Sequence, residues 1–191
     1  NHLFANAKAL VFAGLFFKGK ESDGWYQTGL NIIEKELLEQ VLTDGGNFEL
    51  SPMYHSIFLL DLLDLVNIHH AYNKKQISGV KDKIPLMLYW LKSMCHPDGG
   101  ISFFNDAAFG VAPSLDELLD YAKKLSIKNI SEKVKTLEYL KDSGYIRVER
   151  ENLVAMLDVA NIGPDYIPGH GHADVLSFEL SLFGKRVIVN S

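Results

Sequence analysis

Along most of this chain, apolar residues recur at the spacing of helices that bury one side. The pattern predicts consecutive helices up to about residue 140. The first covers residues 3–17, and the second follows the turn residues Ser22, Asp23 and Gly24 and runs to Val41.

The next three predicted helices begin with clear start signals. Ser51 suits an N-cap and Pro52 suits the first helical position, which predicts a helix to about Tyr72. Another helix is predicted over 80–94. Ser114 and Glu117 have the spacing of a capping box, which begins the last helix.

After residue 144 the hydrophobic period changes to two. Apolar and polar residues alternate over 145–149, and residues 153–159 and 175–183 are also predicted to be extended. Helices followed by strands predict an α+β protein, with two domains joined near residue 142 and a cleft at the join. Residues 186–190 resemble a strand whose partner has not yet appeared, so we expect this chain to be a piece of a longer protein.

Two Asp-Gly-Gly motifs, beginning at Asp44 and Asp98, lie 54 positions apart. Each follows a predicted helix and precedes an aromatic residue. The spacing fits two antiparallel helices with their loops, so both turns should emerge at the same end of a helical array. Loops gathered at one end commonly carry a functional site.

Composition narrows the classes of function. The 191 residues are 47% hydrophobic and 23% charged, as in an ordinary globular protein. A net charge of -5 without a Lys/Arg stripe argues against nucleic acid as a partner. Cys95 is the only cysteine, which excludes an internal disulfide and a cysteine-based zinc site. The apolar runs 3–17 and 57–65 are too short or too charged to span a membrane.

The segment from Gly169 to Leu180 carries the most chemistry. His170 and His172 lie one residue apart, and on an extended chain both imidazoles would point toward one metal ion or one polar substrate group. The flanking glycines would let a ligand approach the backbone closely. Asp174 would share that face and orient an imidazole, or would instead be a surface turn residue.

Three separated motifs occur in order along the chain. They are residues 1–6, which begin Asn1-His2-Leu3-Phe4; residues 44–55, which end Ser51-Pro52-Met53-Tyr54-His55; and residues 169–180. Together with Asp142-Ser143-Gly144-Tyr145, they resemble the heparinase II/III-like polysaccharide lyase family over essentially the whole chain. The resemblance implies an incomplete (α/α) toroid, with residues 1–142 as its C-terminal part. An antiparallel β-sandwich domain would follow, with residues 143–191 as its N-terminal part.

The same resemblance implies that the cleft between the domains cleaves uronic-acid polysaccharides by β-elimination. That reaction removes the C5 proton of a uronate, and the resulting dianion is unstable unless the neighbouring carboxylate is neutralised. By resemblance, Asn1 would neutralise the carboxylate with assistance from His2. Judged from the residues alone, the Asn-His pair could instead cap the first helix.

Tyr54 matches the family's catalytic tyrosine. With Ser51 as N-cap, Tyr54 is the third helical residue, where the positive end of the helix should lower the pKa of the phenol below its usual value of about 10. Such a group suits proton transfer. The alternative from the residues alone is a core tyrosine packed on Ile57 and Phe58. The remaining histidines of the helical part are expected to pack or to face solvent: His55, His69, His70 and His96.

For the histidine pair, the resemblance assigns His170 to the substrate and His172 to a metal site, usually zinc, that braces the sheet domain. Zinc needs three or four ligands. The family's second ligand is an aspartate on the following strand, and Asn190 occupies that position here. An amide oxygen binds zinc poorly, and the third ligand, a histidine, would lie after Ser191.

The sequence therefore predicts a polysaccharide lyase with Asn1, His2, Tyr54 and His170 at its catalytic centre. Its partner would be an acidic polysaccharide of the heparan, alginate or bacterial exopolysaccharide type, and the resemblance implies a periplasmic or secreted bacterial protein. The alternative is a non-catalytic or polysaccharide-biosynthesis protein of the same fold that binds acidic glycans, which Asn190 favours. A metal-dependent hydrolase is less well supported, because no carboxylate pair suits glycoside hydrolysis.

Overall fold

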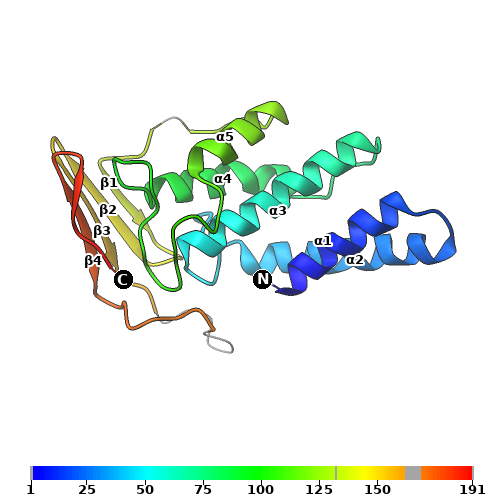
Figure 1. Cartoon of the computed structure of the whole chain (residues 1–191), viewed down its shortest axis with the longest axis horizontal. Coiled ribbons are helices and arrows are strands. Elements are labelled where there is room, and N and C mark those ends of the chain that lie inside the picture. Colours follow the sequence, from blue (N-terminus) through cyan, green and yellow to red (C-terminus); the bar gives the residue numbers. More distant parts are fainter. Residues whose placement is uncertain (1, 132, 162–168, 191) are drawn as a thin grey trace.

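The computed structural model describes residues 2–131, 133–161 and 169–190. Helices come first along the chain: α1 (His2–Phe16), α2 (Lys20–Gln40), α3 (Pro52–Ala71), α4 (Val80–Ser93) and α5 (Leu115–Lys124). Strands follow: β1 (Leu137–Leu140), β2 (Tyr145–Arg150), β3 (Leu153–Asp158), β4 (Phe178–Leu182) and β5 (Lys185–Ile188). In Figure 1 the helices occupy one side of the molecule and the sheet stands at their end.

The predicted starts of α3 and α5 are confirmed. The Ser51 hydroxyl accepts a hydrogen bond from the backbone N–H of Tyr54 (3.2 Å), with a proline at the first helical position. Ser114 forms the expected capping box. The predicted turn at 22–24 is wrong, because these residues lie near the start of α2. The chain turns before it, at Gly19, whose φ of 123° suits glycine.

Helix α3 is buried around most of its circumference and forms the centre of the helical part. The side chains of Phe58, Leu59 and Leu62 are completely excluded from solvent, and the Phe4 ring of α1 lies 4.3 Å from the Phe58 ring. Burial of each such side chain contributes roughly 1.5–3 kcal/mol. The first turn of α3, which carries Tyr54, therefore belongs to a well-packed element.

The five strands form one antiparallel sheet in which each strand pairs with its neighbour in sequence. Its inner face packs on the helices, where Trp90 of α4 meets Tyr145 of β2 edge-on at 5.8 Å. The helical prediction for 137–140 is wrong. Glu138 points inward and accepts a hydrogen bond from Tyr89, so polar and apolar positions are inverted in this short strand. The last strand is not unpartnered either, since β5 pairs with β4.

The outer face of the sheet is apolar and open to solvent. Leu137 is 65% exposed, Tyr139 55% and Phe178 46%. Residues paired across antiparallel strands share a face, and here Tyr139 pairs with Ile146 and Leu157 with Phe178. Such a face is typical of a sheet that packs against a second layer.

The two Asp-Gly-Gly motifs form turns with the same backbone hydrogen bonds. The N–H of Leu42 donates to the carbonyl of Gly46, and the N–H of His96 donates to that of Gly100, both at 2.9 Å. In the first turn, Gly45 has a φ of 92°, and a Cβ there would lie 2.4 Å from a backbone oxygen of α4. The repeat seen in the sequence is therefore a structural repeat.

Both turns meet the sheet, as their predicted common end requires. The Asp44 carboxylate accepts hydrogen bonds from the backbone N–H groups of Asp142 and Ser143 (3.0 and 2.7 Å) and from the Ser143 hydroxyl. The Asp98 carboxylate pairs with Arg186 of β5 at 2.8 Å. Each acidic turn thus anchors a different edge of the sheet to the helices.

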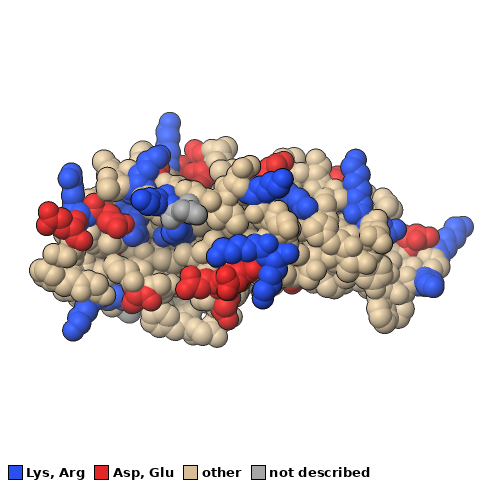
Figure 2. Space-filling model, turned by 90° about the horizontal axis from the view of Figure 1, so that it is seen from above, with Lys and Arg blue, Asp and Glu red and all other residues tan. Residues whose placement is uncertain are grey.

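Charges do not form one continuous patch on the face in Figure 2, where basic and acidic side chains are interspersed. This face lacks the basic stripe that would track a nucleic-acid backbone. Within the described residues, no helix combines the length and the apolar character that crossing a membrane requires.

Candidate functional site

Tyr54, Asp106 and His170 come together from three separate segments. Tyr54 lies in the first turn of α3, Asp106 in the loop between α4 and α5, and His170 in the loop before β4. The Tyr54 and His170 rings have centroids 3.9 Å apart and are tilted by 34°. The carboxylate of Asp106 lies 3.0 Å from Nδ1 of His170 and accepts a hydrogen bond from the Tyr54 hydroxyl. The structure thus joins two of the predicted site residues and adds a third.

Backbone contacts hold these three segments in place. The Ser51 hydroxyl that caps α3 donates a hydrogen bond to the carbonyl of Asp106 (2.6 Å). The backbone N–H of Asp106 in turn donates to the carbonyl of His170 (3.2 Å). The backbone groups of Asp106, without its side chain, therefore connect its loop to the start of α3 and to His170.

Asn105 fixes the floor of the site. Its φ of 57° is unusual for a residue with a side chain, and its buried amide uses both ends. Nδ2 donates to the carbonyl of Leu50, and Oδ1 accepts from the N–H of His172, both at 3.1 Å. The Asn105 N–H donates to the buried Asp174 carboxylate. Asp174 therefore holds a backbone group, and neither predicted role, imidazole acceptor or surface turn residue, is correct.

The pKa of Tyr54 is raised, whereas the helix position predicted a lowered value. Partial burial is the main cause, followed by the negative charge and hydrogen bond of Asp106 and the charge of Glu49. The lost solvation and the two nearby carboxylates disfavour the phenolate more than the positive end of the helix favours it. Tyr54 is therefore a neutral phenol at neutral pH, able to donate a proton.

His170 is suited to accept a proton. A neutral imidazole that donates through Nδ1–H to Asp106 carries its lone pair on Nε2. Its side chain is 21% exposed, and that of Asp106 is 46% exposed, so solutes can reach the pair. A neutral phenol and a basic imidazole in contact can act as an acid and a base.

The two histidines are not on one strand face. His170 lies in a turn, and β4 begins only at Phe178, so the predicted strand from 175 starts too early. His172 is exposed, whereas His170 packs on Tyr54. The turn at Gly169 and His170 breaks the alternation that would align the two rings.

The described residues do not by themselves form a zinc site. Among them, no group of three or more His, Cys, Asp or Glu side chains could hold a metal ion. Asn190 offers only an amide as a side-chain ligand, and its backbone N–H donates to Glu179 (3.1 Å). His172 and Asn190 therefore do not fit zinc as a pair, and the proposed chemistry does not use a metal.

The predicted carboxylate-neutralising pair is placed only in part. Asn1 lies outside the described residues. His2 is the first residue of α1 and is exposed.

Three of the other histidines are structural. His55 is buried, stacks on Trp90 at 4.4 Å, and has its pKa lowered to about 3 by burial. His69 is buried beside Tyr26, and His96 is buried against Glu179 of β4. His70 is exposed, so the expectation for this group is confirmed.

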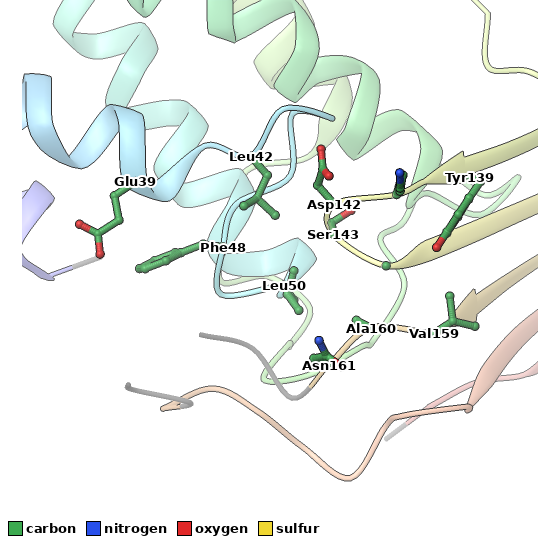
Figure 3. A pocket seen from close by; sticks show the side chains of 12 residues that line it. Glu39, Leu42, Phe48, Leu50, Tyr139, Asp142, Ser143, Val159, Ala160 and Asn161 are labelled. Carbon is green, nitrogen blue, oxygen red and sulfur yellow. The ribbon is translucent and has the colours of Figure 1, made fainter. Parts of the chain in front are cut away.

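A cavity of about 530 Å³, which Tyr54, Asp106 and His170 do not line, lies between the first Asp-Gly-Gly loop and the β1–β2 turn. Figure 3 shows Phe48 and Glu39 on its helical side and Tyr139 on its sheet side. Leu50, whose carbonyl binds Asn105, lines it as well. Its volume is in the range of small-ligand pockets.

Asp106 and Asn105 were missed as site residues because they belong to no sequence motif that we identified. The repeat offered a signal, since Asn105 lies 54 positions after Ser51 and so occupies the equivalent place after the second turn. The same end of two repeat units supplies Tyr54 and Asp106.

Comparison with known families identifies the family of this chain. Residues 1–129 match the model of the heparinase II/III N-terminus, and residues 132–191 match that of the heparinase II/III-like C-terminal domain. The chain belongs to the heparinase II/III family. The predicted fold class, an α+β protein with an incomplete (α/α) toroid followed by an antiparallel β-sandwich domain, is confirmed.

Several known proteins are similar to this chain. A heparin-sulfate lyase of Bacteroides stercoris is 33% identical over 56% of this chain and 16% of its own length, and one of Pedobacter heparinus is 32% identical over 56% and 17%. The crystal structure of heparinase III gives a TM-score of 0.84 at 18% identity, over 99% of this chain and 34% of its own. Heparan sulfate lyase HepC from Pedobacter heparinus gives a TM-score of 0.75 at 22% identity, over 99% of this chain and 32% of its own. This chain thus spans only a minor part of these relatives.

Proposed function

We propose that this chain carries catalytic residues of a polysaccharide lyase that cleaves a uronic-acid glycan of the heparan sulfate class by β-elimination. The contact of Tyr54 with His170, joined by Asp106, is the observation that carries the proposal. The similarity to heparin-sulfate lyases supports the substrate class.

The geometry suggests how the proton transfers would be divided. Nε2 of His170 takes the C5 proton of the uronate, and the electrons of that C–H bond form the C4–C5 double bond. The C4–O4 bond breaks, and the leaving oxygen takes the phenolic proton of Tyr54. The products are an unsaturated uronate at a new non-reducing end and a free anomeric hydroxyl at a new reducing end. The cycle closes when the imidazolium gives up its proton and the phenolate regains one.

Removal of the C5 proton also requires neutralisation of the uronate carboxylate. Asn1 and His2 are proposed for this role by family resemblance, with Asn1 as hydrogen-bond donor. The cavity of Figure 3 is a proposed site for a neighbouring sugar, since Phe48 and Tyr139 offer aromatic surfaces beside charged groups.

The test uses the full-length protein with heparan sulfate, heparin and alginate, and follows the ultraviolet absorbance of the unsaturated uronate. We expect product from heparan sulfate. Tyr54→Phe and His170→Ala should each lower kcat by roughly 10²–10⁴. The matched control is Tyr72→Phe at the C-terminal end of α3, which should behave like the wild type.

A different result would favour the alternative function. If no glycan yields an unsaturated product while binding to acidic glycans persists, the lyase proposal fails and a non-catalytic glycan-binding protein of the same fold is the better description.

A further inference from the structure

Asp106 stands out because one carboxylate contacts both proposed proton-transfer groups. It lies 3.0 Å from Nδ1 of His170 and accepts the hydrogen bond of the Tyr54 hydroxyl. No other described carboxylate is hydrogen-bonded to both. Its side chain is 46% exposed, so it keeps these contacts without being enclosed by the core.

The side chain of Asp106 is not needed to place its own loop. The carbonyl of Asp106 binds Ser51, and its N–H binds the carbonyl of His170, so the main chain makes the structural connections. Asn105 adds four further hydrogen bonds of its own, through its N–H and side chain, to Asp174, Leu50, Tyr145 and His172. A change confined to the carboxylate should therefore leave the loop in position.

We propose that Asp106 is a positioning residue of the elimination reaction, which holds His170 with its proton on Nδ1 and directs the Tyr54 hydroxyl. This rests on the proposed lyase function. An imidazole with Nδ1–H bound to a carboxylate presents Nε2 as the base. Once Nε2 has taken the C5 proton, the negative carboxylate stabilises the imidazolium beside it.

The same carboxylate favours the neutral phenol. Burial, Asp106 and Glu49 together raise the pKa of Tyr54, which keeps its proton available for the leaving oxygen. The charged groups that act on the pair thus include Asp106 from the loop before α5 and Glu49 from the loop before α3. Asp106 is distinguished from Glu49 by its direct contact with the imidazole.

The experiment compares kcat and KM of the full-length wild type, Asp106→Asn and Asp106→Ala on heparan sulfate. We expect both variants to lower kcat by about 10²-fold or more with KM changed less than threefold. Asp120→Asn, an exposed aspartate of α5, is the matched control and should change none of these values.

Chemical rescue separates positioning from a purely structural role. Added formate should restore part of the activity of Asp106→Ala, and chloride at the same ionic strength should not. If Asp106→Asn retains kcat within threefold, the role of Asp106 is overturned and the lyase function stands. If both variants are inactive and formate does not restore activity to Asp106→Ala, the carboxylate acts only in folding and the role is overturned. If the wild type itself makes no unsaturated product, the proposed function fails and this role fails with it.

Discussion

At the residue scale, His55 shows how a motif histidine can be purely structural. Its Nδ1 accepts the backbone N–H of Asn47 (3.2 Å), so its proton lies on Nε2, which donates to the carbonyl of Met87 (3.0 Å). The contact with Asn47 needs the neutral ring, because a protonated imidazole has no acceptor at Nδ1, and burial lowers the pKa of His55 to about 3. His55 therefore ties the first Asp-Gly-Gly loop to α3 and α4 only in its neutral form.

This linkage predicts a pH dependence of stability. Between pH 6.5 and about 3, the unfolded chain binds a proton at His55 that the folded chain does not, so stability falls as pH falls. His55→Gln should be less stable than the wild type at pH 7 by about 1–3 kcal/mol. That difference should shrink by about 1.4 kcal/mol per pH unit below pH 6.5, as measured by urea denaturation.

Two comparisons make this result specific. The pKa of Asp158 is raised to about 6 by burial, so Asp158 stabilises the fold as pH falls and opposes His55; both proteins contain it, so the difference between them cancels it. His70→Gln at an exposed histidine should show no pH-dependent difference. A constant gap between wild type and His55→Gln from pH 7 to pH 5 would contradict the argument.

Tyr54 shows what a single residue's sequence position can and cannot predict. Its place in the first turn of α3 follows from Ser51 and the following proline, and that prediction is correct. The direction of its pKa shift is wrong, because the dominant neighbours are burial and Asp106, which lies 52 positions further along the chain. Local geometry was predictable from local residues, whereas the electrostatics depend on a loop that only the fold brings near.

At the element scale, the same distinction holds. The starts of α3 and α5 were predictable because a cap is a contact between residues three positions apart. Strand β1 was not, because its inward Glu138 is stabilised by Tyr89 of another element, which the alternation rule cannot see. The strand predicted from residue 175 begins only at Phe178, because the preceding loop is held by hydrogen bonds to Asn105 and Asp158, which sequence alternation cannot show.

The two acidic turns should contribute unequally to the junction between helices and sheet. Asp44 is half-buried and accepts three hydrogen bonds from the β1–β2 turn, whereas Asp98 is exposed and pairs with Arg186. Asp44→Ala leaves backbone donors of Asp142 and Ser143 without their acceptor and should lower the free energy of unfolding by about 2–4 kcal/mol. Asp98→Ala should cost about 0–1 kcal/mol. Denaturant melts of the two variants test this order, and equal losses would contradict it.

At the scale of the whole molecule, the sheet separates two environments. Its inner face carries charged and polar groups that bind the helices, such as Arg147, which donates to the carbonyls of Ser93 and Cys95. Its outer face is mainly apolar, with Arg150 and Lys185 at one end. The polar contacts of the sheet therefore lie on the face that meets the helices. The hydrophobic face is left for a further layer.

Charged substitutions on the outer face should improve the behaviour of residues 1–191 alone but destabilise the full-length protein. Residues 1–191 produced alone should self-associate and bind an apolar dye, and Leu137→Lys, Tyr139→Lys and Phe178→Lys together should suppress both. In the full-length protein, a second layer would cover these positions, so the same triple variant should lose roughly 2 kcal/mol or more per buried charge. Light scattering and thermal melting measure the two effects.

Phe183→Lys, at a 76% exposed position in the β4–β5 turn, is the control that should alter neither self-association nor stability. A full-length triple variant as stable as the wild type would show that this face stays in solvent.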